Sequence, residues 1–228
     1  MNQKIKQIYS NKIFKPLHGH PTQIKEKIQY LRLKKKYGQA APKARKIYHI
    51  NPREIKYTVP SKHLPEKRLI YGVIDGDWDK KKLNWNETAF KGLKERFEED
   101  KKWEETRYYK IGVKKIQKGN NFGPLPGNQS LENFQQYLKK IDKLHEDIKK
   151  NGYDQNSIIT VNIGRNGEFI CHHGNHRTTI SKILKIKQIP VKIKYRHKKW
   201  QEKRNIAIKN SEKLSKEEIN HLDIENLI

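Results

Sequence analysis

The sequence has one cysteine, few acidic residues for its many basic ones, and no long apolar run. A single cysteine excludes an intramolecular disulfide, so nothing points to an oxidising compartment. No apolar stretch approaches the roughly 18 residues that a membrane-spanning helix needs. The lysine-rich start lacks the apolar segment of a secretory signal. We therefore expect a cytoplasmic protein without a transmembrane segment.

Apolar content is also low, because hydrophobic residues and charged residues each make up 33% of the 228 residues. A chain of this length with a modest core is typical of one domain with appendages. We predict a central domain at 47–198, with an insertion at about 60–128. A basic helical extension at 1–46 precedes it, and a helical tail at 199–228 follows it.

The positive charge is large, with a formal net value of +26. Such an excess predicts an anionic partner: nucleic acid, an anionic membrane surface or a phosphorylated substrate. The alternative is compositional, since lysine, isoleucine and asparagine are used heavily throughout. Lysine is mixed with glutamate and far outnumbers arginine, the residue favoured for specific phosphate and base contacts. Weak, salt-sensitive binding to nucleic acid is expected in either case.

Hydrophobic spacing and cap residues predict the elements that surround the centre of the chain. From about Thr22 to Tyr37 we expect a helix with Ile24, Ile28 and Leu31 on one face, docked on its own domain. The other expected elements are strands within 47–59, a helix at 88–97, a short amphipathic segment at 103–109, a loop at 118–130, a helix from the Ser130 cap to Lys150, a basic helical segment at 195–209, and a Ser215/Glu218 capping box.

Residues 161–193 are the stretch where apolar pattern, turn residues and functional groups coincide. Val161 and Ile163 alternate with polar residues as a half-buried strand does. Asn166-Gly167 is typical of a tight hairpin turn, and a return strand follows at 169–171. After Gly174 the apolar spacing becomes helical, and 189–193 predicts a further strand.

The strand-to-helix junction carries a cluster suited to phosphate. A helix N-terminus offers unpaired N–H groups and a positive dipole, and Gly174 lets a ligand approach the backbone. Arg177 adds a planar donor fork, and Thr178 and Thr179 add hydroxyls. The glycine spacing of the P-loop and of the dinucleotide fingerprint is absent. Another interpretation is that Gly174 is a plain turn glycine and the histidines are exposed.

The run GEFICHHGNHRTTISKILKIKQIPVKI resembles the ParB/sulfiredoxin superfamily. Its members share a strand, a Gly-x-His/Arg-Arg motif that opens a helix, and a Val-Pro-Val-like strand. Gly174, His176 and Arg177 fall on the motif positions, and the resemblance covers about 131–195, reaching back towards Ile47. It implies an α/β (α+β) fold with a small mixed sheet, flanking helices and a helical N-terminal extension. It also implies a site for nucleotide phosphate at 174–179, for ATP, ADP or CTP.

The departures from the family pattern reduce the number of family functions that we expect for this chain. Sulfiredoxins carry their reactive cysteine where this chain has Asn175, so we do not expect sulfinic acid reduction. Partition proteins have Glu-Arg-Arg after the glycine and then a helix-turn-helix domain. Here fewer than about forty residues follow the last expected strand, too few for such a reader and a dimer module. His173 replaces the acidic residue often found before the glycine.

A second group of functional residues lies at 70–79, IYGVIDGDWD. Asp75, Asp77 and Asp79 alternate, so an extended chain would place them on one side. They fail the EF-hand pattern, because Lys80 stands where glycine is needed and Asn86 where a bidentate glutamate is needed. Asp75 and Asp77 remain candidates for Mg²⁺ beside a nucleotide, or for a general base. The alternative is a solvated acidic turn.

Taken together, these features predict a nucleotide-dependent phosphotransferase (kinase-like) acting on a hydroxyl-bearing small molecule or sugar. Gly174, Asn175, Thr178 and Thr179 would cradle the phosphates, and His176 and Arg177 would neutralise the transferring charge. The rival hypothesis is a basic ParB-like DNA-binding or nuclease-like protein. A metal site from Cys171, His172, His173 and His176 is disfavoured, because a strand sends Cys171 and His172 to opposite faces.

Overall fold

The structure is a computed structural model, and it describes residues 21–63, 70–125 and 130–228. In these residues the protein is a mixed α/β fold around a seven-stranded sheet, which confirms the expected fold class at that level. The helices are α2 (Pro21–Tyr37), α3 (Lys91–Phe97), α4 (Arg107–Gln117), α5 (Leu131–Asn151), α6 (Asn175–Ile183), α7 (Lys198–Asn210), α8 (Lys216–Ile219) and α9 (Leu222–Glu225). Within the described ranges, no helix is long and apolar enough to cross a membrane.

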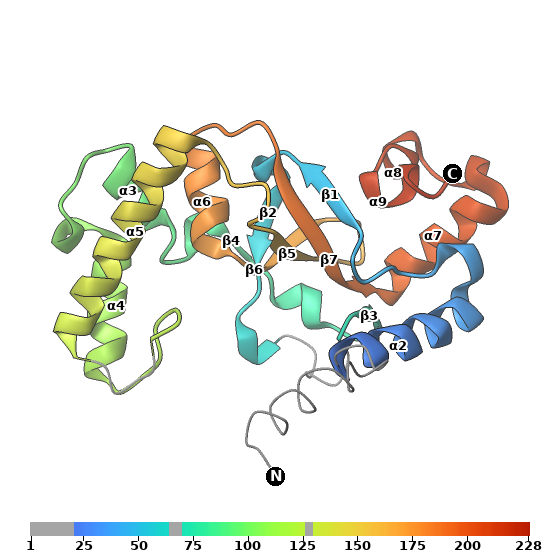
Figure 1. The fold of residues 1–228 in the computed structure, drawn as a ribbon, viewed down its shortest axis with the longest axis horizontal. Helices are drawn as coiled ribbons and strands as arrows, with labels where there is room; N and C mark the ends of the chain where they lie inside the picture. The colour runs from blue at the N-terminus through green and yellow to red at the C-terminus, as the bar shows by residue number, and fades with distance from the viewer. Residues whose placement is uncertain (1–20, 64–69, 126–129) are drawn as a thin grey trace, which may run out of the picture.

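The strands form one mixed sheet in the middle of the molecule (Figure 1). They are β1 (Ile47–Ile50), β2 (Ile55–Thr58), β3 (Gly72–Ile74), β4 (Leu83–Asn84), β5 (Ile159–Ile163), β6 (Phe169–His173) and β7 (Ile189–His197). Their order is β1-β7-β5-β6-β2-β4, and β3 pairs with the second half of β7, beyond β1. β7 runs parallel to β5, and β6 runs parallel to β2, whereas β5 and β6 form an antiparallel hairpin.

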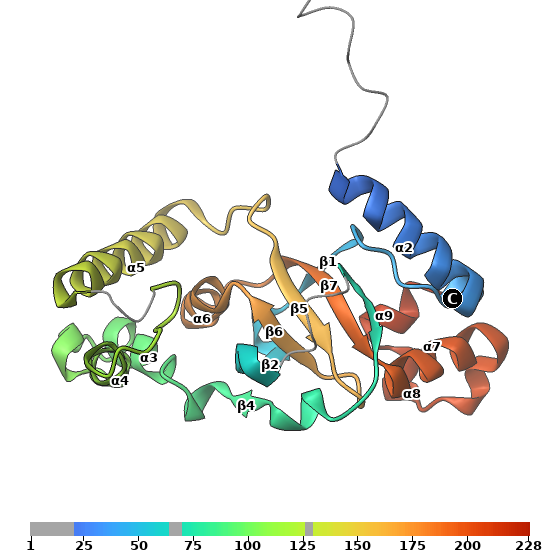
Figure 2. The same ribbon diagram turned by 90° about the horizontal axis from the view of Figure 1, so that it is seen from below.

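The two faces of the sheet are covered differently. One face carries the main core, where Ile159, Val161 and Ile163 pack with residues of α5 and α6, including Ile141 and Ile180. The region 85–125, which contains α3 and α4, joins the same core and lies beside α5 and α6 (Figure 2). On the opposite face, Ile170 packs with Val59 and Trp78. We call this second side the polar face, because Thr160, Asn162 and His172 project from it.

Several local predictions are confirmed. Ser130 caps α5, its hydroxyl accepting a hydrogen bond from the Asn133 amide at 3.1 Å. The Ser215/Glu218 capping box begins α8. The β5–β6 hairpin is also present, but its connection spans Gly164 to Glu168, and Gly167 is its only residue with positive φ, at 91°. The predicted hairpin is therefore confirmed, and its turn includes residues on both sides of the Asn166-Gly167 pair.

Several helices and strands begin or end at other residues than the sequence predicted, because their bounds depend on partners that are distant in the chain. β7 continues to His197 instead of ending at Ile193, because β3 pairs with Tyr195, Arg196 and His197. The expected short segment at 103–109 is a 3₁₀ turn followed by α4, whose cap is Thr106. The predicted helix at 88–97 is the shorter α3. The 118–130 loop falls partly on 126–129, outside the described residues.

The tail after β7 belongs to the main core, because Trp200 and Ile224 are buried in it. Asp223 of α9 accepts from Arg196 Nε at 2.8 Å and pairs with Arg204 at 2.7 Å. Burial acts to raise the pKa of Asp223, but the two guanidinium groups outweigh it and lower the pKa to about 2. This buried ion cluster ties α7 and α9 to β7.

Helix α2 docks on the rest of the chain, but not through the expected face. Leu33 is buried with Ala41 and Tyr71, and Tyr30 and Tyr37 pack beside them. Ile24, Ile28 and Leu31 point outward instead, with 45%, 46% and 57% of their surface exposed. The prediction chose the wrong side because α2 has apolar residues on both.

Candidate functional site

The strand-to-helix junction has the predicted form. α6 begins at Asn175, directly after β6, and Gly174 is its N-cap, in the left-handed region at φ 101°. Among the described residues no side chain caps this end, and the first helical hydrogen bond runs from the Thr178 amide to the Gly174 carbonyl at 2.9 Å. The preceding amides of the first turn therefore have no acceptor within the helix. An anion placed there would accept hydrogen bonds from these amides and would also interact favourably with the helix dipole.

Glycine is required at position 174 for two reasons. A side chain is strained at this φ, and a Cβ atom would lie 3.1 Å from Cγ1 of Ile159 and 3.3 Å from Nη2 of Arg177. The Asn175 side chain follows, and its Oδ1 is buried with no hydrogen-bond partner among the described residues. A ligand hydroxyl would satisfy that oxygen.

The other predicted phosphate ligands already have partners. Arg177 Nη1 donates to the carbonyl oxygen of Ser157 at 2.9 Å and to the Ser157 hydroxyl, which ties α6 to the segment before β5. Thr178 and Thr179 are buried, and their hydroxyls donate back to the carbonyls of Gly174 and Asn175 at 3.0 and 2.9 Å. Such back-bonding occupies the hydroxyl protons within the helix.

His176 lies in an aromatic enclosure formed by Phe90, Tyr108 and Tyr137. Its Nε2 is 2.6 Å from the Tyr108 hydroxyl, and the Tyr137 hydroxyl is 3.4 Å away. Burial lowers the pKa of His176 to about 4, so the ring is neutral at pH 7. The predicted role for His176, neutralising phosphate charge, would need a cation that this environment disfavours.

Cys171 sits on the core side of β6 and is a buried thiol. Its sulfur lies 3.8 Å from the Thr178 hydroxyl, and burial raises its pKa to about 12. His172 faces the other side of the strand, against Asn162 and Lys194. Among the described residues, no group of three or more His, Cys, Asp or Glu side chains is placed to hold a metal ion.

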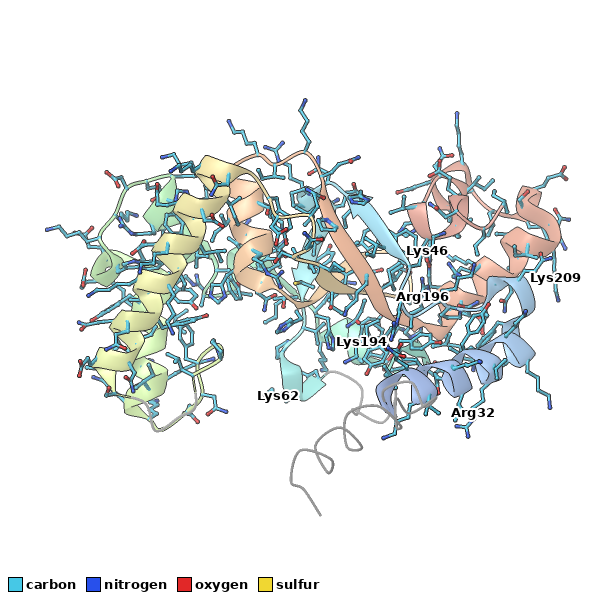
Figure 3. All side chains as sticks on the ribbon, in the orientation of Figure 1. Arg32, Lys46, Lys62, Lys194, Arg196 and Lys209 are labelled. Carbon is cyan, nitrogen blue, oxygen red and sulfur yellow. The ribbon has the colours of Figure 1, made fainter. Side chains whose placement is uncertain are left out.

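The polar face holds further candidate site residues, of which Thr160, Lys192 and Lys194 were not singled out from the sequence. A pocket of about 300 Å³ lies between this face and α2, where Thr160, His172, Lys192 and Lys194 line it. We call it the α2 pocket; its remaining walls are Glu26, Ala44, Ile70, Tyr71, His173 and Ile193. Lys194 extends from β7 into the region between the sheet and α2 (Figure 3).

A lysine–histidine–asparagine chain forms one wall of the α2 pocket. Lys194 Nζ is 3.1 Å from His172 Nε2, and Asn162 Nδ2 is 3.2 Å from His172 Nδ1. The Asn162 oxygen accepts from the Tyr195 amide at 3.2 Å, which leaves the amide nitrogen facing the histidine. Burial, and next Lys194, lower the pKa of His172 to about 4. The ring is therefore neutral at pH 7, so one of its two nitrogens can accept a hydrogen bond, from either Lys194 or Asn162.

The α2 pocket and the start of α6 share one end of the sheet. Thr160 is paired with His173 of β6 on one side and with Lys192 of β7 on the other. His173 directly precedes Gly174, the N-cap of α6. The exposed Lys192 therefore lies two strands away from the N-terminus of α6. We call Lys192 and Lys194 the basic row, and the alternation of lysine with valine and isoleucine at 191–194 is the sequence signal for it.

Asp75 and Asp77 lie elsewhere, beside the turn of the β5–β6 hairpin. Asp77 pairs with Arg165 at 2.9 Å, and Asp75 pairs with Lys198 at 2.9 Å. Hydrogen bonds from these basic groups lower the pKa of both carboxyls. Arg165 precedes β6 and Gly174 follows it, so five strand residues, roughly 16 Å, separate the carboxylates from the start of α6.

Asp79 differs from its two neighbours because it is buried inside a 3₁₀ turn, Trp78–Lys81. It accepts from the Arg165 amide at 2.8 Å and from Nη2 of the same residue at 2.6 Å. Burial acts to raise the pKa of Asp79, but the hydrogen bonds from Arg165 outweigh it, and the net shift is downward. The three aspartates do not share one side, as an extended chain would have required.

Comparison with known proteins adds no relative: no family model, no curated protein and no solved structure matches this chain.

Proposed function

We propose that this chain is a ParB/sulfiredoxin-like nucleotide-binding protein that holds nucleotide phosphates at the start of α6. The observation that carries the proposal is the uncapped N-terminus of α6, at the same end of the sheet as the basic row of the polar face. Open amides and a helix dipole lie at that end of the sheet, and the exposed Lys192 lies at the same end, two strands away. These groups favour an anion with several oxygens.

A nucleotide suits this end of the sheet better than free phosphate, because the donors are accompanied by an unused acceptor. Phosphate oxygens would accept from the amides of α6, and a ribose hydroxyl would donate to the buried Oδ1 of Asn175. Gly174 allows the close approach, and the Arg177–Ser157 contact fixes the helix start. Arg177 thus contributes by holding α6 as well as by its charge.

Phosphoryl transfer to a hydroxyl-bearing acceptor is the finer part of the proposal. It requires groups that orient the acceptor and offset negative charge in the transition state. Asp75 and Asp77 are the proposed Mg²⁺ ligands or base, although their lowered pKa values suit metal binding better than proton abstraction. Because they lie at the far end of β6, this role requires the transferring phosphate to extend along the sheet towards them while the other phosphates stay seated at α6.

Calorimetry with ATP, ADP, CTP and GTP, each with Mg²⁺, tests binding. Lys192→Ala removes an exposed charge, so we expect nucleotide affinity to fall about tenfold or more without loss of stability. Lys199→Ala is the matched control, since this exposed lysine lies on α7, beyond the far end of β7. Arg177→Ala should lower both affinity and stability. If no nucleotide binds, or both lysine variants behave alike, the proposal fails.

Transfer is measured separately, by following phosphorus resonances of the bound nucleotide in the presence of pooled sugars and small alcohols. Asp75→Asn and Asp77→Asn should keep nucleotide binding and lose transfer. A protein that binds nucleotide but transfers nothing to any acceptor would be a binding-only relative, and Asp75 and Asp77 would lose their proposed role.

The rival proposal, a basic ParB-like DNA-binding or nuclease-like protein, is favoured by the net charge of +26. It predicts duplex binding that falls steeply with salt and prefers one sequence. Binding without sequence preference would follow from the charge alone.

A further inference from the structure

Helix α2 presents apolar residues on two opposite sides. Its inner side packs through Leu33, Tyr30 and Tyr37. Its outer side carries Ile24, Ile28 and Leu31, at the i, i+4, i+7 spacing of one helix face, and each is between 45% and 57% exposed. We call these three residues the outer stripe. In both ribbon views α2 lies at the periphery of the described fold (Figures 1 and 2).

The outer stripe is bordered by positive charge on both flanks. At 100° per residue, Lys25 and Arg32 fall on one side of it and Lys27 and Lys34 on the other. All four are exposed, as are Lys35 and Lys36 in the last turn. Arg32 projects from the outer side of the helix, away from the sheet (Figure 3).

The helix keeps its one acidic residue away from this surface. Glu26 is half-buried on the inner side, where it accepts from Arg45 Nε at 2.8 Å and lines the α2 pocket. The outer surface of α2 therefore combines exposed aliphatic side chains with basic ones and has no carboxylate of its own.

This combination of aliphatic and basic side chains selects among three possible partners, which are a second copy of this chain, duplex nucleic acid and a lipid bilayer. A second copy docked stripe to stripe would bring the flanking lysines of both helices together, and like charges at close range oppose pairing. Duplex nucleic acid would pair with the lysines but would gain little from three aliphatic side chains. A bilayer with anionic lipids uses both features, because aliphatics enter the acyl boundary while lysines extend to the headgroups.

We propose that the outer side of α2 docks on an anionic lipid surface, with the outer stripe inserted at the interface and the flanking lysines paired with headgroups. The helix lies flat in this arrangement, since the stripe runs along its axis for about 10 Å. The attachment is reversible, because three partly exposed aliphatics bury far less apolar surface than a lipid anchor. It does not depend on the nucleotide proposal.

Vesicle flotation with the full chain tests the docking. Phosphatidylcholine vesicles serve as the neutral surface, and phosphatidylcholine mixed with phosphatidylglycerol as the anionic one. Ile28→Gln/Leu31→Gln removes most of the outer stripe, and Lys27→Gln/Lys34→Gln removes one basic flank. The control variants are Leu131→Gln, an exposed aliphatic of α5, and Lys139→Gln/Lys143→Gln, two exposed lysines of the same helix.

We expect the wild type to float with anionic vesicles and not with neutral ones. Both α2 variants should lose about tenfold or more in partitioning, because each lysine and each inserted aliphatic side chain contributes separately. The α5 variants should behave as wild type, and all variants should keep the wild-type melting temperature, since the changed side chains are exposed.

Three results would overturn the proposal. The first is no binding to anionic vesicles. The second is vesicle binding that the stripe variant retains in full, which would reduce the effect to net charge. The third is a wild-type dimer that Ile28→Gln/Leu31→Gln converts to a monomer, which would assign the outer stripe to a second copy of this chain.

Discussion

The hydroxyl of Tyr108 lies 2.6 Å from Nε2 of His176, within an enclosure of aromatic rings. Burial raises the pKa of Tyr108 well above its usual value and lowers the pKa of His176 to about 4, so both groups are neutral at pH 7. This contact joins α4 to the start of α6 and makes His176 an anchor for the helix that we propose to bind phosphate.

A neutral buried histidine makes stability depend on pH. The folded pKa of His176 is about 4 and the ordinary value is 6.5. As pH falls from 6.5 towards 4, the unfolded chain takes up a proton that the folded chain does not. This lowers the free energy of unfolding, by up to ~3 kcal/mol.

Urea unfolding at pH 7.5 and pH 4.5 measures the effect. We expect His176→Asn to show a smaller loss of stability between the two pH values than the wild type. His173→Asn, which changes an exposed histidine, should leave the loss unchanged. An equal pH dependence in wild type and His176→Asn would contradict the assignment.

Asp79 and Asp77 both contact Arg165 but should respond differently to substitution. Asp79→Asn leaves the guanidinium group beside a buried, uncharged partner, and we expect a loss of about 3 kcal/mol in the free energy of unfolding. Asp77→Asn changes an exposed carboxylate and should have little effect on stability. Chemical denaturation of the two variants, side by side, makes the comparison. Similar losses would mean that the burial of Asp79 is unimportant.

Gly174→Ala should cost more than backbone strain alone. Its new Cβ would press on Ile159 and Arg177 at a φ that alanine avoids, for which we expect about 2 kcal/mol or more. Gly38→Ala is the control, because Gly38 also has positive φ, but a Cβ added there would meet no described atom within 4 Å. It should lose about 1 kcal/mol. Equal losses would show that the crowding at Gly174 relaxes without cost.

Cys171 should resist thiol reagents in the folded protein, because burial raises its pKa to about 12 and leaves little thiolate. We expect labelling at pH 8 to proceed only as fast as the protein opens, and to accelerate in urea in step with unfolding. Rapid labelling of the native chain would require an accessible thiolate. It would contradict this prediction and would make Cys171 a candidate for redox chemistry.

Local sequence was sufficient where neighbouring residues decide the structure. The Ser130 cap and its apolar spacing predicted α5, Gly174 and the spacing after it predicted α6, and Asn166-Gly167 marked a hairpin. Each of these signals acts within a few residues, through hydrogen bonds and backbone conformations that the local chain makes by itself. The alternation of lysine with valine and isoleucine in β7 is a local signal of the same kind, and it indicates a strand.

Tertiary structure decided which side chains are buried and which are available. Asp79 meets Arg165 from 86 positions away, and Tyr108 meets His176 from 68 positions away, so no local pattern separates Asp79 from Asp77 or reveals a neutral His176. α2 shows the same limit: its periodicity marked an amphipathic helix, but packing against Tyr71 selected Leu33 for the interior and left Ile24, Ile28 and Leu31 outside. Burial is a property of the assembled surfaces, and a residue's own sequence neighbours do not specify the partner that covers it.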